Sequence, residues 1–128
     1  MLDHIGLAVA DFPRSRGFYE AALKPLGISL LVALTKAETG GYEGAGFGAD
    51  GRPFFWIGIG DRAKGGAHVA FAAPTRAKVD AFYAAALGAG GRDNGGPGLR
   101  PHYDPDYYGA FVFDPDGNNV EAVCREPE

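Results

Sequence analysis

The chain has few of the residues that would link it to an oxidising compartment, a membrane or a polyanion. Its single cysteine, Cys124, excludes an intrachain disulfide, and the apolar run around it predicts a buried thiol. The 12 Lys and Arg residues are outnumbered by 16 Asp and Glu, and a net charge of −4 argues against nucleic acid or anionic membrane as a partner. No segment approaches the roughly 20 apolar residues of a membrane span, and MLDHIGLAVAD lacks the basic start of a signal peptide. We therefore expect a cytoplasmic protein that binds a small molecule.

Glycine, by contrast, is abundant. Many of the 21 glycines cluster in TGGYEGAGFGADG and LGAGGRDNGGPG, which predict turns and loops. The first cluster contains a G-x-G-x-x-G pattern from Gly46 to Gly51, but Arg52 and Pro53 follow it where a dinucleotide site needs a helix. We interpret these glycines as turn residues.

One segment of the chain is used twice. HIGLAVADFPRSRGFYEAALKPLG begins at His4, and HVAFAAPTRAKVDAFYAAALGAGG begins at His68, with a constant offset of 64 residues. His, Phe-Tyr, Ala-Ala, Leu and Gly recur at this offset without a gap. The repeat predicts two modules, about 1–64 and about 65–128, in a single domain of 128 residues.

Each copy predicts a strand, a helix and then three strands. In the first strand, small residues alternate with bulky ones, so that one face carries His4, Gly6 and Ala8 in the first copy and His68, Ala70 and Ala72 in the second. Asp11 and Thr75 are expected to cap the helices, and Gly88 to end the second one. The later strands are expected at ISLLVALT, YEGAGFG and PFFWIGIG, then at 91–93, YYGAFVF and NNVEAVC. The expected fold class is α+β, with two tandem βαβββ modules forming a curled mixed sheet around a cleft.

His4, His68 and Glu121 are candidate metal ligands. A lone interior histidine is more often held by packing, but these two share one repeat position, with Gly or Ala leaving room beside each imidazole. Glu121 interrupts an apolar strand, where an unpaired carboxylate is costly to bury. A bound metal, an arginine partner or exposure on an edge strand would each avoid that cost. For Glu121 taken alone, exposure is the default expectation. The aspartates of DPDG, residues 114–117, are interpreted as turn formers.

The segments DHIGLAVAD, AHVAF and DPDGNNVEAV together resemble the vicinal oxygen chelate superfamily, which includes glyoxalase I, extradiol dioxygenases and bleomycin resistance proteins. The resemblance covers essentially the whole chain. It implies paired βαβββ modules around a metal cleft, with metal positions on His4, His68 and Glu121. Because members of the superfamily often pair modules between chains, it also implies a homodimer.

The resemblance also raises the question of a fourth ligand, which glyoxalase I takes from the first module. The repeat offset and the alignment of the two Asp-Gly turns place this position between Phe55 and Ile57, where Phe55, Trp56 and Ile57 are all non-ligands. Two imidazoles and one carboxylate remain, a set that favours Fe²⁺ or Mn²⁺, with Zn²⁺ or Ni²⁺ as alternatives.

The stretch from Arg100 to Glu121 is similar to the extradiol dioxygenase signature, with His102 at the position of its histidine. Phe111 stands where that signature has tyrosine, and Arg100 departs from its start. The expected catalytic or substrate-positioning side chains are His102, Tyr103, Tyr107 and Tyr108. A flexible loop whose His and Tyr are surface residues is an equally good interpretation.

Two functions follow from these observations. The first is a lyase or dioxygenase-like metalloenzyme in which a divalent metal chelates substrate oxygens. The alternative is a metal-free binding module that resembles bleomycin resistance proteins and holds its ligand between the sheets of a dimer. The retention of three potential ligands favours the enzyme.

Overall fold

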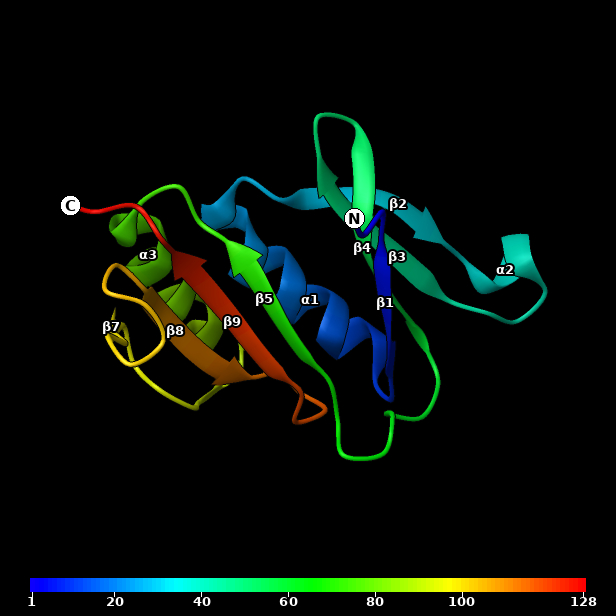
Figure 1. Ribbon diagram of the computed structural model, residues 1–128. Helices are drawn as coiled ribbons and strands as arrows, with labels where there is room; N and C mark the ends of the chain where they lie inside the picture. The colour runs from blue at the N-terminus through cyan, green and yellow to red at the C-terminus, as the bar shows by residue number, and fades with distance from the viewer.

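A computed structural model describes residues 1–128 and confirms the α+β class, with each module built on its own mixed sheet (Figure 1). The first module contains β1 (Ile5–Val9), α1 (Phe12–Leu23), the 3-10 helix η1 (Lys24–Leu26), β2 (Ser29–Leu34), α2 (Lys36–Thr39), β3 (Gly44–Ala49) and β4 (Arg52–Ile59). The second contains β5 (His68–Ala72), α3 (Arg76–Gly88), β6 (Arg92–Asp93), β7 (Gly98–Leu99), β8 (Tyr108–Phe113) and β9 (Asn119–Cys124). The short elements α2 and β7 were not predicted.

The two long helices begin where the sequence predicts, and the second ends at Gly88, as expected. The Asp11 side chain accepts a hydrogen bond from the Arg14 backbone N–H, and Thr75 accepts one from Lys78, both at 3.2 Å. These caps satisfy backbone donors that the first helical turn leaves free. The helices α1 and α3 pack against each other on one side of the sheets (Figure 1). None of the helices is long and apolar enough to cross a membrane.

The sheets have the same strand order, which places corresponding strands in corresponding positions. The first runs β1-β4-β3-β2 and the second β5-β9-β8-β6, with β7 also paired to β8. In both, the first strand of the module lies at the edge and is parallel to the last strand. The registers pair Gly6 with Trp56 and Ala70 with Glu121, so Trp56 and Glu121 occupy equivalent places.

The core lies between the sheets and the helices and is dominated by aromatic rings. Tyr19 packs against Phe55 with ring centroids 4.9 Å apart, and Phe55 meets Phe71 of the second module edge-on at 5.2 Å. Cys124 is buried, as predicted. Because side chains alternate along a strand, the residues between these core positions lie on the other face of each sheet, which we call its open face.

One local interpretation was wrong. Gly46 and Gly48 belong to β3, and the turn contains only the residues that follow, Asp50 and Gly51, both with positive φ. The ring of Trp56 lies where a side chain at Gly46 would stand, and the backbone of Arg52 lies where one at Gly48 would stand, so both positions of the strand require glycine.

Candidate functional site

The open face of the second sheet carries a histidine in contact with a buried carboxylate. Nε2 of His68 lies 2.8 Å from Oε1 of Glu121, on the neighbouring strand β9. Glu121 is only 1% exposed, whereas the His68 side chain is 54% exposed. Since a carboxylate buried without partners is strongly unfavourable, this contact explains how the strand tolerates Glu121. The default expectation of an exposed Glu121 is therefore wrong.

Tyr107 holds the second carboxylate oxygen. Its hydroxyl donates a hydrogen bond to Oε2 of Glu121, and burial together with this contact raises the pKa of Tyr107 to about 12. The phenol therefore keeps its proton at neutral pH and acts as a donor. Gly109 leaves room for the pair, because a Cβ there would lie 3.1 Å from the Tyr107 ring. Both oxygens of Glu121 thus face polar groups on the same open face.

The loop before β8 places two further predicted residues beside this network. The His102 and Tyr103 rings have centroids 4.3 Å apart, and Tyr103 meets Tyr107 edge-on at 5.0 Å. Tyr103 is 60% exposed, and His102 is also exposed. A series of rings therefore leads from solvent at His102 to the carboxylate of Glu121.

Arg125 is a contributor that the sequence reasoning missed. Its guanidinium carbon lies 4.9 Å from the centroid of the Tyr107 ring, a cation–π geometry, and a guanidinium nitrogen lies 4.0 Å from Asp104. Alternation along β9 from Glu121 through Val123 already places Arg125 on the open face, so the period of the strand could have identified it.

Tyr108, although adjacent to Tyr107, lies on the helix side of the sheet. Its hydroxyl donates to Asp80 on α3 at 2.6 Å, and this hydrogen bond is the main cause of its raised pKa. The guanidinium of Arg76 stacks over its ring at 5.2 Å. These contacts tie β8 to α3 and keep Tyr108 away from the His68–Glu121 pair.

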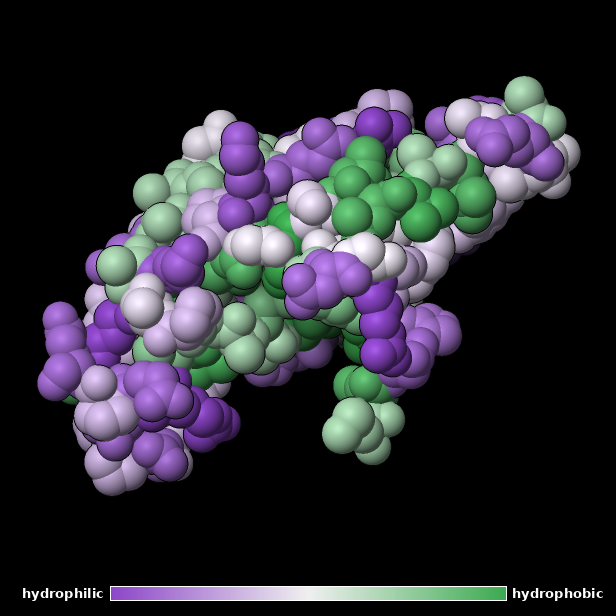
Figure 2. Space-filling view, turned by 90° about the horizontal axis from the view of Figure 1, so that it is seen from above, coloured by the Kyte–Doolittle hydropathy of each residue, from purple (hydrophilic) through white to green (hydrophobic).

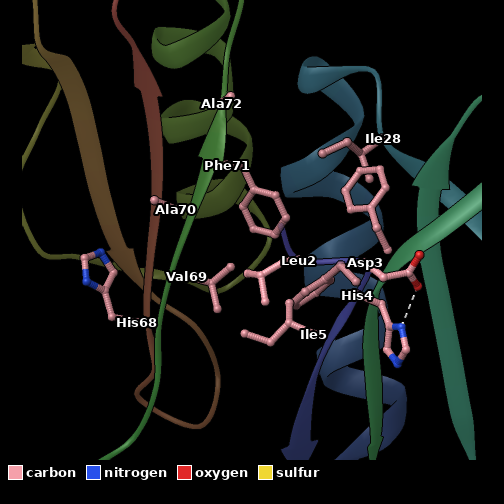
Figure 3. Close-up of a pocket in the computed structure, with 12 residues that line it drawn as sticks. Leu2, Asp3, His4, Ile5, Ile28, His68, Val69, Ala70, Phe71 and Ala72 are labelled. Carbon is pink, nitrogen blue, oxygen red and sulfur yellow. Dashed lines mark hydrogen bonds and ion pairs between the residues drawn. The ribbon is translucent and has the colours of Figure 1, made fainter.

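His4 lies apart from the pair in a single copy of the chain. Its Nδ1 is 2.8 Å from Asp3, and the two side chains are 61% and 66% exposed. The hydrogen bond from His4, followed by that from Arg52, lowers the pKa of Asp3. Figure 3 shows the His4 and His68 rings directed away from each other, with the side chains of Leu2, Ile5 and Val69 between them.

The expected convergence of three ligands is therefore not met within one chain. No group of three or more His, Cys, Asp or Glu residues is close enough to hold a metal ion. The physical reason is the arrangement of the modules, because they pack through α1 and α3 while β1 and β5 remain separate sheet edges. The equivalence of Trp56 with Glu121 also supports the absence of a carboxylate ligand from the first module.

The DPDG turn joins the two modules. Asp114 is 1% exposed and accepts hydrogen bonds from the backbone N–H groups of Asp116 and Asn118, as expected of a turn former. It also accepts one from the hydroxyl of Tyr19 on α1, at 2.5 Å. Asp116 in turn accepts from the backbone N–H of Ala10 at 3.1 Å. The turn thus fixes the start of β9, which carries Glu121, against the first module.

The chain uses a βαβββ unit twice and carries an imidazole and a buried carboxylate on neighbouring strands of one open face. This architecture places it in the class of α+β proteins that are built from paired modules. Comparison with protein families identifies the group within that class. The chain belongs to the Glyoxalase/Bleomycin resistance protein/Dioxygenase superfamily, whose sequence model matches residues 1–122.

Solved structures agree with this assignment. A glyoxalase/bleomycin resistance protein from Albidiferax ferrireducens T118 is 30% identical, with a TM-score of 0.78 over 98% of this chain and 99% of that one. The V278E mutant of glyoxalase I from Zea mays is 26% identical, with a TM-score of 0.70; the match covers 95% of this chain and 45% of the maize chain. A domain from Frankia sp. EAN1pec, 18% identical with a TM-score of 0.69, shows the shared fold. A comparison with curated proteins found no match.

Proposed function

We propose that the protein is a small-molecule enzyme that uses a divalent metal, with His68 and Glu121 as two ligands and His4 as the third. The observation that carries the proposal is the 2.8 Å contact between His68 and the 1% exposed carboxylate of Glu121. An imidazole nitrogen and a carboxylate oxygen at this separation fit Fe²⁺ or Mn²⁺, and also Zn²⁺ or Ni²⁺. A bound metal would supply Lewis acidity toward substrate oxygens.

His4 would come from a second copy of the chain. The strands β1 and β5 are both unpaired sheet edges, and exposed edges favour association with another chain. Apolar residues at the start of β1 are open to solvent, with Leu2, before the strand, 82% exposed and Ile5, its first residue, 36% exposed. Figure 2 shows hydrophobic side chains gathered over the middle of the molecule, between hydrophilic ends. A homodimer that pairs the open face of one module with that of the other module in the partner would bring His4 to the pair.

The remaining residues would orient ligand and substrate. Tyr107 would hold the Glu121 carboxylate through its hydroxyl, because a pKa of about 12 keeps that proton in place. His102 and Tyr103, exposed on the loop beside Tyr107, would position the substrate or exchange a proton with it. Tyr108 has a structural role in this proposal, since it contacts Asp80 on the helix side.

One observation favours a second candidate, a metal-free binding module. A single chain brings only two of the three ligands together, and both oxygens of Glu121 already have partners in His68 and Tyr107. A carboxylate satisfied in this way needs no metal to remain buried.

Titration calorimetry with Mn²⁺ on the EDTA-treated protein distinguishes the two functions. We expect saturable binding by the wild type, and an affinity at least about tenfold lower for Glu121→Gln, which keeps the shape and removes the charge. His102→Ala, the matched control, should bind Mn²⁺ like the wild type. Equal affinity in wild type and Glu121→Gln, or no binding by either, would favour the metal-free module.

A further inference from the structure

We propose that the open face of the first sheet binds a flat, uncharged ring in a cavity beside β1. The cavity measures about 220 Å³, and its lining includes Gly6 and Ala8 of β1, Trp56 and Gly58 of β4, and Tyr42. None of its eight lining residues carries a charge. It is separate from the His68–Glu121 pair, which lies on the other sheet.

The two walls are aromatic rings that lie against glycine backbone. A Cβ built on Gly46 would come within 2.8 Å of the Trp56 indole, and one on Gly58 within 1.7 Å of the Tyr42 hydroxyl. Real Cβ atoms do not approach this closely, so any other residue at these positions would displace the rings. The glycines therefore allow both rings, which line the open space, to lie close to the sheet.

The floor leaves this space empty. At Gly6 an added Cβ would meet only Trp56, at an ordinary contact distance of 3.8 Å. A ligand of about one or two rings can therefore rest on Gly6 and Ala8 and contact the aromatic walls. Stacked and edge-to-face aromatic pairs gain energy beyond the area they bury, which favours a planar ring over an aliphatic one.

The absence of charge in the lining decides the charge of the ligand. A charged group placed here would lose hydration without gaining an opposite charge, which is strongly unfavourable. The complementary ligand is a neutral planar ring, such as a benzene ring carrying a small uncharged substituent.

The cavity also bears on the substrate. His4 lies just before β1 and does not line the cavity, but Gly6, which does, follows it by two residues. A ring in the cavity would therefore lie near the third proposed metal ligand. The inference that this ring is part of the substrate rests on the proposed function. Ring binding itself does not rest on it and can be measured on the metal-free protein.

The test uses the chain's single tryptophan, Trp56. The ¹⁵N-labelled, EDTA-treated protein gives one indole N–H signal, which is followed during titration with benzamide and with cyclohexanecarboxamide. Both probes carry the same neutral amide, and only benzamide has a planar ring. We expect a saturable shift with benzamide and about three- to tenfold weaker binding of the cyclohexane compound. No saturable shift with either probe, or equal affinity for both, would overturn the proposal.

Two variants locate the binding. Gly6→Val places methyl groups in the cavity, so benzamide affinity should fall at least about tenfold; Tyr42→Ala, which removes one wall, should also weaken it and serves if Gly6→Val does not fold. The matched control is Gly17→Ala on α1, where a Cβ meets nothing within 4 Å and binding should not change. Wild-type affinity in both cavity variants would contradict the proposal.

Measuring Mn²⁺ affinity in the same proteins separates this inference from the proposed function. Ring binding without Mn²⁺ binding would refute the enzyme and support the cavity. Mn²⁺ binding without ring binding would support the enzyme and refute the cavity proposal.

Discussion

The hydroxyl of Tyr19 joins the two modules, and its removal should measurably destabilise the protein. Tyr19 is fully buried and donates to Asp114 at 2.5 Å, and Asp114 also accepts from the side-chain amide of Asn118 at 2.9 Å. Tyr19→Phe removes one donor from this buried carboxylate and leaves the ring in place. A hydrogen bond to a charged group contributes about 1.5–3 kcal/mol, so we expect a loss of about 2 kcal/mol in the free energy of unfolding. For a chain of this size, the loss lowers Tm by about 5–10 °C.

The repeat supplies the matched control. Tyr83 occupies the same position in the second module, and its hydroxyl donates to Asp93 at 2.9 Å on the surface. Tyr83→Phe should leave Tm unchanged, because solvent replaces the lost contact. Calorimetric scans and urea unfolding of the three proteins test this difference. Equal losses in the two variants, or no loss in Tyr19→Phe, would refute the reasoning.

The same hydroxyl predicts a dependence on pH. Burial, followed by the nearby Asp114, raises the pKa of Tyr19 well above its ordinary value of 10.0. The folded protein therefore holds this proton more tightly than the unfolded chain does. The resulting stability is fully present below about pH 10 and is lost as the pH rises above it. Urea unfolding between pH 9 and pH 11 should show the gap between wild type and Tyr19→Phe narrowing as the pH rises; a constant gap would contradict the assignment.

Two further predictions concern the second module. Tyr107→Phe removes a donor from buried Glu121, so the free energy of unfolding should fall by about 1–3 kcal/mol, with a circular dichroism spectrum like that of the wild type. Urea unfolding measures this, and unchanged stability would show that solvent replaces the hydroxyl. Cys124 is 1% exposed, so its thiol should react with a disulfide reagent only after denaturation; rapid reaction in the native protein would contradict its burial.

Much of the fold could be read from the sequence because its signals are local. The offset of 64 residues between the copies, the caps at Asp11 and Thr75 and the alternation around His68 depend on neighbours only a few positions apart. They predicted the two modules, the start of each long helix and the face on which His68 lies. The short strand β7 was missed because its two residues, Gly98 and Leu99, are too few to show a period.

The site depended on the pairing of distant segments, which no local pattern reports. Tyr107 and Tyr108 are neighbours in the sequence, and the register of β8 against β9, with Phe111 opposite Glu121, decides which of them reaches the carboxylate. The same register, with the contact from His68, buried a glutamate that would be exposed by default.

The sequence by itself determined which residue types stand at the equivalent positions of the two modules. It placed His4 at the repeat position equivalent to that of His68. It also excluded a carboxylate from the position of the first module that is equivalent to Glu121, where Trp56 lies. Only the tertiary structure decided which of these residues meet. The pairing of β5 with β9 brings His68 to Glu121, and the packing of α1 against α3 keeps His4, which contacts Asp3, away from that pair. Both depend on contacts between residues far apart in the chain, which no local pattern of the sequence reports.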